Sequence, residues 1–566
     1  MSETLLSPGV LAQESDRSLI TKQAQVVGAA IVGPTAKGPL TPTVVTSMSE
    51  YSAIYGGGIT SGSFPYSYLT TISANNYFSQ GGQSLLVQRV VSGSFTPASS
   101  TAYSILNPAS ASFVLSTISE GVLMNSSGSE NASGSLASGS ADNIRWEITN
   151  VNTGSGTFNL VVRQGNDTTK NKIILETFNG LSLDPLSSNY IEKAIGNTVY
   201  NIRNEGTDYY VQPSGSYSNK SNYIVVSSVT LKTPNYLNSD GSIKSEFTSS
   251  LPLVGSGSFS GATGNQYYGT ALFNENISAT NVQGVNPNDY TASLYLLTNT
   301  NDYKFNLITT PGLNATTHAS AVNALVTVAE TRQDCLAVVD LEDYGATVAD
   351  VTAAAAGINS SYAAAYWPWL QTIDPNSGQV IWVPASTMIP GMFAFSDKTT
   401  EPWFAPAGTQ RGALGNVIQA ERKLTAGNKD SLYVNNINPI ATIPQTGVVV
   451  FGQKTLQKQE TALNRVNVRR LLIELKSFIS QIGSTLVFEQ NTTATRNLFL
   501  SQVNPYLESV QQRQGLYAFN VKMDDENNNA STIDRNELVG QITIQPTKTA
   551  EFILLNFTID PTGTSF

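Results

Sequence analysis

Continuous apolar runs in the middle of the chain predict buried strands separated by an amphipathic helix. Residues 304–312 (KFNLITTPG) and 335–341 (CLAVVDL) have the pattern of strands that are covered on both faces. Residues 317–334, between them, place apolar side chains at helical spacing, namely Val322, Leu325, Val326 and Ala329. A strand, a helix and a second strand in this order predict a parallel sheet. We therefore expect the region from about 290 to 400 to be α/β.

The same alternation continues downstream. Residues 347–361 predict a helix that ends near Gly357, and residues 362–373 predict a further strand. Residues 383–398 predict the start of another helix, with Pro384 near its first position, where the fixed φ of proline is favourable.

Two long helices are predicted in the carboxy-terminal third. Residues 464–483 have one apolar face at 3-4 spacing and end at a glycine, and their cations lie off that face. The apolar positions are Val468, Leu471, Leu472, Leu475, Phe478, Ile479 and Ile482, and the cations are Arg465, Arg469, Arg470 and Lys476. Residues 495–515 predict a second helix with a kink or restart at Pro505. A solvated face is the simpler interpretation of the cations.

The chain ends in a pattern that predicts a β-hairpin. Ile542 and Ile544 alternate with polar residues, and Pro546 and Thr547 interrupt the run. Apolar residues then recur at every second position, at Ile553, Leu555, Phe557 and Ile559. A two-stranded ribbon is marginally stable in water and has two unpaired edges. The pattern therefore raises the question of what pairs with those edges.

The region before the α/β part is less apolar. Residues 125–141 are so rich in Ser and Gly that they predict an exposed loop or linker. Residues 144–148 and 157–163 alternate as strands, and residues 189–197 predict a short helix, which together indicate a small α+β insertion. Residues 255–264 (GSGSFSGATG) lack the offsets of a phosphate-binding loop and are interpreted as a flexible joint.

Composition limits the function classes. The 566 residues allow three or four domains, and 31 Lys and Arg against 41 Asp and Glu give a net charge of −10. An acidic chain does not fit a nucleic-acid groove, which needs a basic surface. Charged residues make up only 13%, and a neutral polar surface is common where copies pack together. No long apolar run or signal-peptide pattern occurs, so we expect a protein made in the cytoplasm that does not span a membrane.

Candidate chemistry is sparse. His318 is the single histidine, so it cannot build a multi-histidine zinc site, and no G-x-S-x-G motif accompanies it. No nucleotide-binding G-x-x-x-x-G-K-[ST] motif is present, so work driven by ATP is not expected. Cys335 is the single cysteine, which excludes an internal disulfide, and it is predicted to be a core residue.

Two acidic segments are candidate sites. Residues 524–537 do not supply acidic ligands, Gly and Glu at the positions of a calcium loop, so a solvated turn is predicted. Asp340, Glu342 and Asp343 follow a strand, where carboxylates can act as acid and base, but no second constellation meets them. A solvated loop is the favoured interpretation, and neither a catalytic residue, a metal nor a cofactor is predicted.

Several segments, in this order, resemble the contractile tail sheath proteins of myophages. The most specific is W-x-x-P-A-G-x-x-R-G, from Trp403 to Gly412, in combination with the later Arg-Arg helix and the terminal strands. The resembling segments are LLSPGV, LITTPG, ETRQDCLAVVD, EPWFAPAGTQRGAL, NRVNVRRLLIELKSFI and STIDRNELVGQITIQPTKTAEFILLNF, with ILETFNGLSLDPLSSNYIEKAIGN in the insertion. The stretch from about 96 to 141 departs from the family.

The resemblance implies a multidomain α/β and α+β fold: a parallel-sheet core, an inserted α+β domain, and a carboxy-terminal domain of helices and a hairpin completed by strands from neighbouring subunits. The implied divisions are an amino-terminal arm (1–22), a core (23–95 with 265–370), an inserted outer part (96–264), a conserved sheath domain (371–535) and a terminal hairpin and arm (536–566). The arm would contribute Leu5, Leu6 and Val10 to an added strand, and Pro8 and Gly9 would set its bend.

The resemblance also implies a structural role rather than an enzyme. Sheath subunits form stacked six-fold rings around a tail tube and contract from a metastable extended state to drive the tube through the host envelope. The implied partners are further copies of the chain, the tail tube protein, the baseplate and the tail terminator, in a virion assembled in the host cytoplasm. Arg465, Arg469, Arg470 and Lys476 are candidates for the tube-facing surface, although Arg469 and Arg470 fit an internal clamp between domains nearly as well.

Three alternatives remain open at this point. A subunit of a related contractile injection system would share the same segments. A self-assembling surface protein would share the polar composition but normally carries an export signal. An oligomeric enzyme would need a cluster of perturbed ionisable groups.

Overall fold

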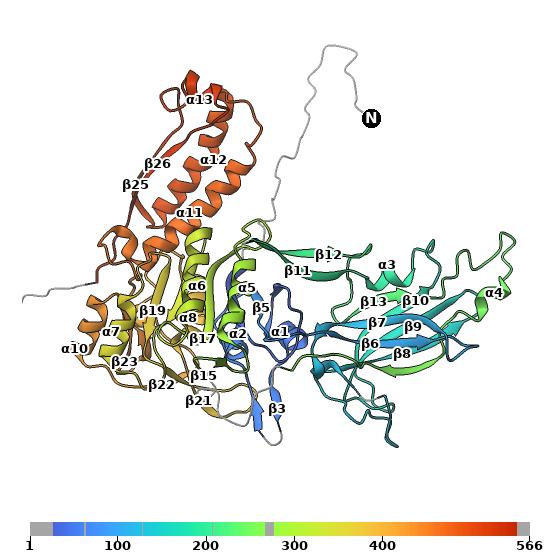
Figure 1. Cartoon of the computed structure of the whole chain (residues 1–566). Coiled ribbons are helices and arrows are strands. Elements are labelled where there is room, and N and C mark those ends of the chain that lie inside the picture. Colours follow the sequence, from blue (N-terminus) through green and yellow to red (C-terminus); the bar gives the residue numbers. More distant parts are fainter. Residues whose placement is uncertain (1–26, 62–63, 127, 207, 266–276, 552–566) are drawn as a thin grey trace, which may run out of the picture.

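The computed structural model describes residues 27–61, 64–126, 128–206, 208–265 and 277–551. Its centre is an eight-stranded sheet in the order β2-β5-β1-β17-β18-β19-β23-β24 (Figure 1). The six inner strands are parallel, and the edge strands β2 and β24 are antiparallel to their neighbours. In sheet order the strands are Thr43–Val45, Leu85–Arg89, Val27–Gly33, Phe305–Asn314, Leu336–Asp340, Ala363–Trp367, Ile437–Ile443 and Gly447–Val450.

Helices cover both faces of this sheet, which explains why its inner strands are apolar without alternation. Ala30, Ile308, Ala337 and Ala363 lie side by side on four neighbouring strands and point to the face covered by α5, α6, α7 and α10. The opposite face is covered by α1, α2 and α8. The bounds of these helices are Tyr290–Leu296 (α5), Ala319–Arg332 (α6), Val348–Ala356 (α7), Ala426–Val434 (α10), Met48–Tyr55 (α1), Leu69–Ser79 (α2) and Ala385–Thr399 (α8).

The predicted α/β part is confirmed. β17, α6 and β18 form the expected parallel unit, α7 ends next to Gly357, and α8 begins directly after Pro384. Cys335 is fully buried, as predicted for a core residue. The run 362–373 is split at Pro368, because β20 (Leu370–Ile373) leaves the large sheet and joins β21 (Val380–Val383) and β22 (Val417–Ala420).

The division expected at residue 371 does not match the fold. β23 and β24 lie beyond that position and nevertheless extend the large sheet, and α8 packs on its face. The sequence pattern did not reveal this, because β19 and β23 are neighbours in space but about seventy residues apart in the chain.

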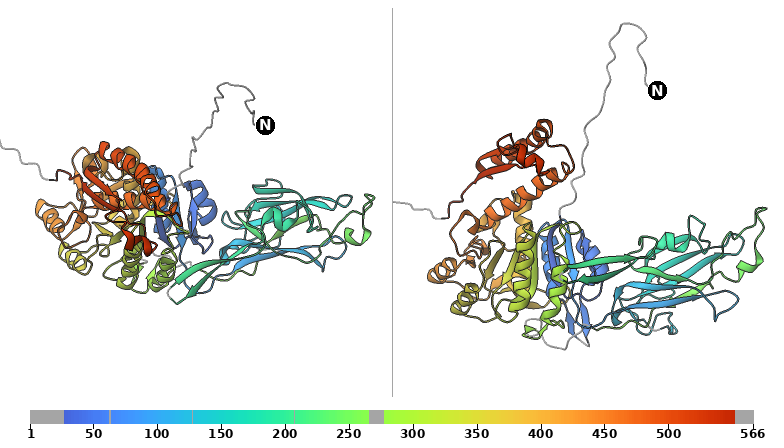
Figure 2. Two further views of the ribbon diagram at one scale, coloured as in Figure 1. Left: turned by 90° about the horizontal axis from the view of Figure 1, so that it is seen from above. Right: turned by 45° about the horizontal axis from the view of Figure 1, so that its top comes forward.

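Between β5 and β17 the chain leaves the large sheet and builds a β-rich part beside it (Figures 1 and 2). This part has its own buried cluster, in which Phe113 and Phe158 stack with their ring centroids 5.7 Å apart. Its sheets have the orders β10-β9-β8-β14, β13-β7-β6 and β11-β12. The strands, from β6 to β14, are Pro97–Tyr103, Ala111–Glu120, Ile144–Asn152, Thr157–Gln164, Ile174–Ser182, Val199–Glu205, Asp208–Ser214, Ile224–Val229 and Gly255–Ser258, with short helices Ile191–Ile195 (α3) and Ser245–Thr248 (α4).

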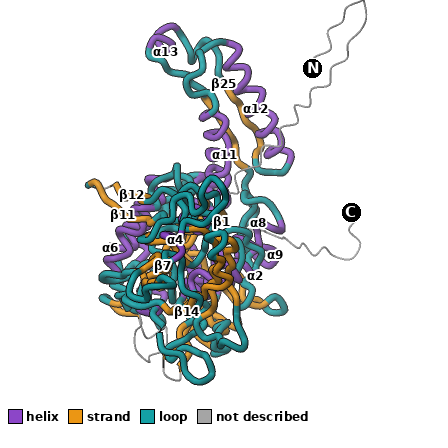
Figure 3. The backbone as a smooth tube through the Cα atoms, turned by 90° about the vertical axis from the view of Figure 1, so that its right-hand side faces the viewer, coloured by secondary structure: helices purple, strands orange, loops and turns teal. Residues whose placement is uncertain are grey.

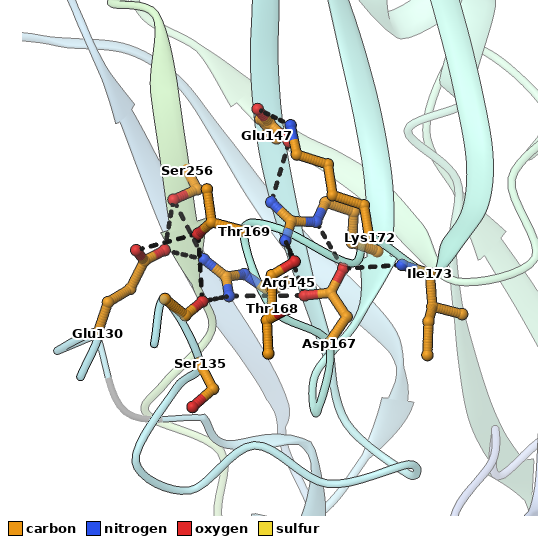
Figure 4. A network of polar contacts seen from close by, with 12 residues as sticks. Glu130, Ser135, Arg145, Glu147, Asp167, Thr168, Thr169, Lys172, Ile173 and Ser256 are labelled. Carbon is orange, nitrogen blue, oxygen red and sulfur yellow. Dashed lines mark hydrogen bonds and ion pairs between the residues drawn. The ribbon is translucent and has the colours of Figure 1, made fainter. Parts of the chain in front are cut away.

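The Ser/Gly-rich residues 125–141 are not a free linker. The carboxylate of Glu130 accepts hydrogen bonds from Arg145 and from the hydroxyl of Ser256, and the carbonyl of Gly134 accepts one from Arg145 at 3.1 Å (Figure 4). Arg145 is almost completely buried and lies 3.5 Å from the carboxylate of Asp167. Composition did not predict this packing, because polar contacts to a buried arginine replace the large apolar residues that the segment lacks.

We predict that shortening this segment destabilises the protein. Replacing residues 129–136 by two glycines removes Glu130 and leaves buried donors of Arg145 without acceptors, which costs about 1–3 kcal/mol. The free energy of unfolding from urea titration should fall by that amount. Replacing the exposed turn at 238–242 by two glycines serves as the control and should have little effect. Equal stability of both shortened proteins would show that the segment is an unpacked linker.

Residues 255–264 are likewise not a flexible joint. Residues 255–258 form β14, which pairs antiparallel with β8. Gly257 lies against the indole of Trp146, where an added Cβ would come within 2.2 Å of the ring. The glycine therefore permits a close approach of strand and ring, which explains a glycine-rich sequence within a sheet.

The carboxy-terminal part projects from the large sheet (Figures 1 and 3). It consists of the antiparallel helices α11 (Val466–Ser484) and α12 (Thr493–Gln512), the strands β25 (Leu516–Lys522) and β26 (Gln541–Pro546), and the short helix α13 (Ala530–Asp534). The two predicted long helices are confirmed, but α12 continues through Pro505 without a restart. The remaining described strands and α-helix are β3 (Ile59–Ser61), β4 (Phe64–Tyr66), β15 (Ile277–Ser278), β16 (Asn281–Val282) and α9 (Gly408–Arg411), and short 3-10 helices lie at Val122–Met124, Pro287–Asp289 and Ala462–Asn464.

Asp340 is buried rather than solvated. It lies at the end of β18 and accepts a hydrogen bond from the backbone N–H of Ser386 at 3.0 Å and another from the Ser386 hydroxyl. Burial raises the pKa of its carboxyl from 3.8 to about 7, although the bonds from Ser386 act in the opposite direction. Glu342 and Asp343 are half-buried and bind Thr316 and Asn314, so the three acids do not converge on one site.

The raised pKa of Asp340 predicts a pH dependence of stability. The unfolded chain ionises this carboxyl above pH 3.8 and the folded chain only near pH 7, so its contribution is complete at low pH and lost as the pH rises through 7. The total loss is on the order of 4 kcal/mol, since one pKa unit corresponds to about 1.4 kcal/mol. Asp340→Asn should therefore flatten the change in unfolding free energy between pH 5 and pH 8. An unchanged slope in urea titrations at the two pH values would contradict this prediction.

Candidate assembly surface

The carboxy-terminal part carries a two-stranded ribbon with open edges. β25 and β26 pair antiparallel from Leu516 with Pro546 to Lys522 with Gln541, with one register shift between Leu516 and Ala518. No third strand pairs with either of them within the described part of the chain. Each outer edge therefore presents backbone N–H and C=O groups that can accept another strand.

One face of the ribbon is apolar and supported. Phe519 and Ile544 are cross-strand partners, as are Val521 and Ile542, and all four pack against the helical hairpin. The opposite face is polar and exposed, with Asn520 paired to Thr543. The buried face fixes the register, because a shift by one residue would turn these apolar side chains to solvent.

The helices that support the ribbon contact each other, and the end of α12 contacts Trp403. The rings of Phe478 on α11 and Tyr506 on α12 stack at 3.7 Å between centroids. The indole N–H of Trp403 donates to the carbonyl of Arg513 at 3.0 Å, just beyond the end of α12. Trp403 therefore anchors the return of the chain from α12 into β25.

The predicted strand at Ile542 and Ile544 is confirmed, but its described partner is β25, which the sequence analysis missed. A signal was present, because Phe519 and Val521 alternate with polar residues soon after Gly515. The expected second hairpin strand, with Ile553, Leu555, Phe557 and Ile559, lies outside the described residues. The arm residues Leu5, Leu6, Pro8, Gly9 and Val10 also lie outside them.

Glu551, the last described residue, accepts several hydrogen bonds at the base of the ribbon. The carboxylate of Glu551 accepts from Arg465 Nε at 2.7 Å, from the Tyr433 hydroxyl at 2.6 Å and from Gln453 Nε2 at 2.9 Å. Burial opposes its ionisation, but these hydrogen bonds and the Arg465 charge lower the pKa of Glu551 overall. Glu551 is therefore a fixed point beside β26.

Two of the four predicted tube-facing cations are internal. Arg469 is 4% exposed, stacks on Tyr362 at 3.9 Å and donates to the Ser361 carbonyl at 3.2 Å. Arg470 is 3% exposed and binds the carboxylate of Asp397 on α8 at 2.8 Å. Both residues join α11 to the central α/β part, as expected for the alternative of an internal clamp between domains. They are not on a surface that can meet a partner.

The side chains of Arg465 and Lys476 are more exposed to solvent than those of Arg469 and Arg470. Arg465 binds Glu551, and the ammonium of Lys476 lies 3.1 Å from Gln333 Oε1 and 3.4 Å from the Tyr362 hydroxyl. A contact of either with a tube protein stays a prediction.

Both ring nitrogens of His318 lie within hydrogen-bond distance of backbone groups. The imidazole of His318 accepts from the backbone N–H of Asn314 at Nδ1 and lies 2.9 Å from the carbonyl of Ser278 at Nε2, which is a structural role. Within the described ranges, no group of three His, Cys, Asp or Glu side chains could hold a metal ion. None of the described helices is long and apolar enough to cross a membrane.

The chain is a multidomain protein in which a covered α/β sheet is joined to a projecting helical hairpin. Its most distinctive surface is the open edge of the ribbon on this hairpin, which can accept a further strand. Residues 283–456 match the phage tail sheath protein central domain, and residues 458–560 match the phage tail sheath C-terminal domain. These two matches confirm the resemblance to contractile tail sheath proteins seen in the sequence.

Curated relatives support this assignment. The tail sheath protein of Vibrio phage KVP40 is 36% identical over 209 residues, covering 37% of this chain and 31% of the relative. That of Enterobacteria phage T4 is 31% identical over 272 residues, covering 45% of this chain and 41% of the relative. The aligned segments thus span well under half the length of either relative.

Solved structures show that the fold is shared over nearly the whole chain. The helical sheath of the anti-feeding prophage in its contracted state has a TM-score of 0.51 at 13% identity, covering 99% of this chain and 100% of that one. A sheath tail protein from Listeria innocua has a TM-score of 0.52 at 11% identity, covering 93% and 96%.

Proposed function

We propose that this chain is the structural subunit of a contractile phage tail sheath. Copies form stacked six-fold rings around a tail tube and contract from a metastable extended state, which drives the tube through the host envelope. The chain acts as a polymer subunit and not as an enzyme, and it needs no cofactor.

The observation that carries this proposal is the open ribbon of β25 and β26. Its apolar face is already covered by α11 and α12, so a further strand adds main-chain hydrogen bonds at a supported edge without new core packing. The terminal arms of other copies, from residues 1–22 and 552–566, are the strands we assign to the two edges. Pairing of this kind keeps subunits connected while the rigid parts rotate.

Partners follow from the same proposal. The tail tube protein lies inside the rings, and Arg465 and Lys476 are the cations on α11 and its start that remain available to it. The baseplate and the tail terminator bind the two ends of the sheath in the virion, after assembly in the host cytoplasm. The matched curated relatives are phage proteins, which favours a phage tail over another contractile injection system.

Electron microscopy of the purified chain tests this function. We expect hollow cylinders with six-fold symmetry at high protein concentration, and shorter assemblies or free subunits on dilution. A protein that stays monomeric at all concentrations, with and without tail tubes, would refute the proposal.

A further inference from the structure

An exposed aromatic side chain lies at the tip of the helical hairpin, where residues 485–492 connect α11 to α12. Phe488 is 99% exposed and has a backbone φ of 73°. A bulky residue in the left-handed region is unusual and costs about 1–2 kcal/mol. Its neighbour Val487 is also exposed. The positive φ fits the third position of a turn that is closed by a hydrogen bond from the Glu489 N–H to the Leu486 carbonyl at 3.1 Å. The turn accounts for the backbone, but it does not account for a large apolar ring that lies fully in solvent.

The same chain carries an apolar groove at the opposite end of α11. The groove has a volume of about 760 Å³. Its apolar lining comes from the segment before α9, from α10 and from β23 and the residues after β24, namely Phe404, Ala407, Tyr433, Val434, Pro439 and Phe451. Val434 is 76% exposed and Phe451 is 49% exposed, so the described residues leave this lining open to solvent.

The charges beside Phe488 at the hairpin tip and in the apolar groove are complementary. Glu489, next to Phe488, has an exposed carboxylate. The groove contains Arg411, whose guanidinium lies over Phe404 at 5.2 Å, and Lys429, whose ammonium lies over Phe451 at 5.4 Å. Neither cation forms an ion pair with another described residue. Of the two acids in the groove, Glu551 is paired with Arg465, which leaves Asp430 as the opposing charge.

We infer that Phe488 of one subunit inserts into this groove of a second copy, with Glu489 beside Arg411 and Lys429. A subunit cannot fill its own groove, because the 19 residues of α11 separate the two places by about 28 Å. The contact joins two different surfaces, and such contacts close into rings or continue as helical filaments. The inference rests on the proposed self-assembly and adds an apolar contact to the strand exchange at the ribbon.

Engineered cysteines test this contact directly, because the single native cysteine is buried. Phe488→Cys combined with Val434→Cys should give a ladder of disulfide-linked oligomers after mild oxidation of assembled protein. Each single variant should give none. Cylinders that form without a ladder would overturn the inference while leaving the proposed function intact, and absence of cylinders from the unmodified chain would overturn both.

A pair of serine variants provides a second measurement. Phe488→Ser should leave the melting temperature of the monomer unchanged, since the ring touches solvent. The variant should raise the concentration needed for assembly about tenfold. This factor corresponds to less free energy than the full burial of a Phe side chain provides. Leu106→Ser changes an equally apolar side chain, 70% exposed, in the β-rich part and should not alter assembly. Equal assembly thresholds for the two variants would contradict the inference.

Discussion

Truncation after Glu551 is expected to leave a folded monomer that no longer forms long polymers. The described structure holds Glu551 through Arg465, Tyr433 and Gln453, so removing residues 552–566 leaves these contacts in place. What is lost is the strand that we assign to the edge of another subunit's ribbon. Because each lost strand removes several main-chain hydrogen bonds at every subunit of the polymer, the effect on assembly should be nearly complete.

The truncation point matters for interpreting this experiment. Deletion from residue 550 would also remove Glu551 and leave Arg465 without its partner, so a loss of stability could be mistaken for a loss of assembly. Deletion of residues 1–20 is the companion variant and should have the same result. Circular dichroism checks the fold, and electron microscopy checks the polymers. Normal cylinders from both truncated proteins would exclude strand exchange through the arms.

Replacement of Arg470 by Met is expected to lower the free energy of unfolding by about 2 kcal/mol or more. Arg470 is buried, its guanidinium binds Asp397 and lies 4.7 Å from the ring centre of Phe393, and both partners are on α8. Removing one member of such a pair leaves the other charge partly desolvated, which accounts for the loss. Since Asp397 keeps some exposure, the effect should be smaller than for a fully buried pair.

Two further variants make this prediction specific. Arg470→Met with Asp397→Leu removes both charges and should recover much of the loss, because no unpaired charge remains. Arg535→Ala breaks an exposed pair with Glu537 and should change stability little. If Arg470→Met unfolds like the parent protein but binds tail tubes more weakly, Arg470 is a tube contact and not a clamp.

The clamp bears on the proposed contraction. Arg469 and Arg470 fix the start of α11 to the central α/β part, so the helical hairpin and the sheet should move together as one body. In the proposed contraction, motion between subunits is then expected in the segments that lead to the arms. This division into rigid parts and connecting strands fits a sheath that rearranges without refolding its domains.

The α/β part was predictable because its signals are local. The apolar runs of β17 and β18 and the helical spacing of α6 each lie within one stretch of sequence. The membership of β23 in the same sheet was not predictable, because strand order depends on packing between segments distant in the chain.

The candidate site was predictable only in part, for related reasons. The alternation at Ile542 and Ile544 identified β26, but nothing local connects it to β25, about twenty residues earlier. Helical spacing placed Arg469 and Arg470 off the apolar face of α11, yet the first turns of this helix are enclosed on all sides by α8 and by the segment around Tyr362. Periodicity describes one helix, and burial depends on what surrounds it.

A reconstruction of the assembled polymer by cryo-electron microscopy tests the central claim most directly, at a resolution that traces individual strands. The account predicts that β25 and β26 become the inner strands of a larger sheet, with a strand from the amino-terminal arm of one neighbour and a strand from the carboxy-terminal arm of another at its two edges. A ribbon whose edges stay open in the polymer, or are closed by residues 552–566 of the same chain, would contradict the account.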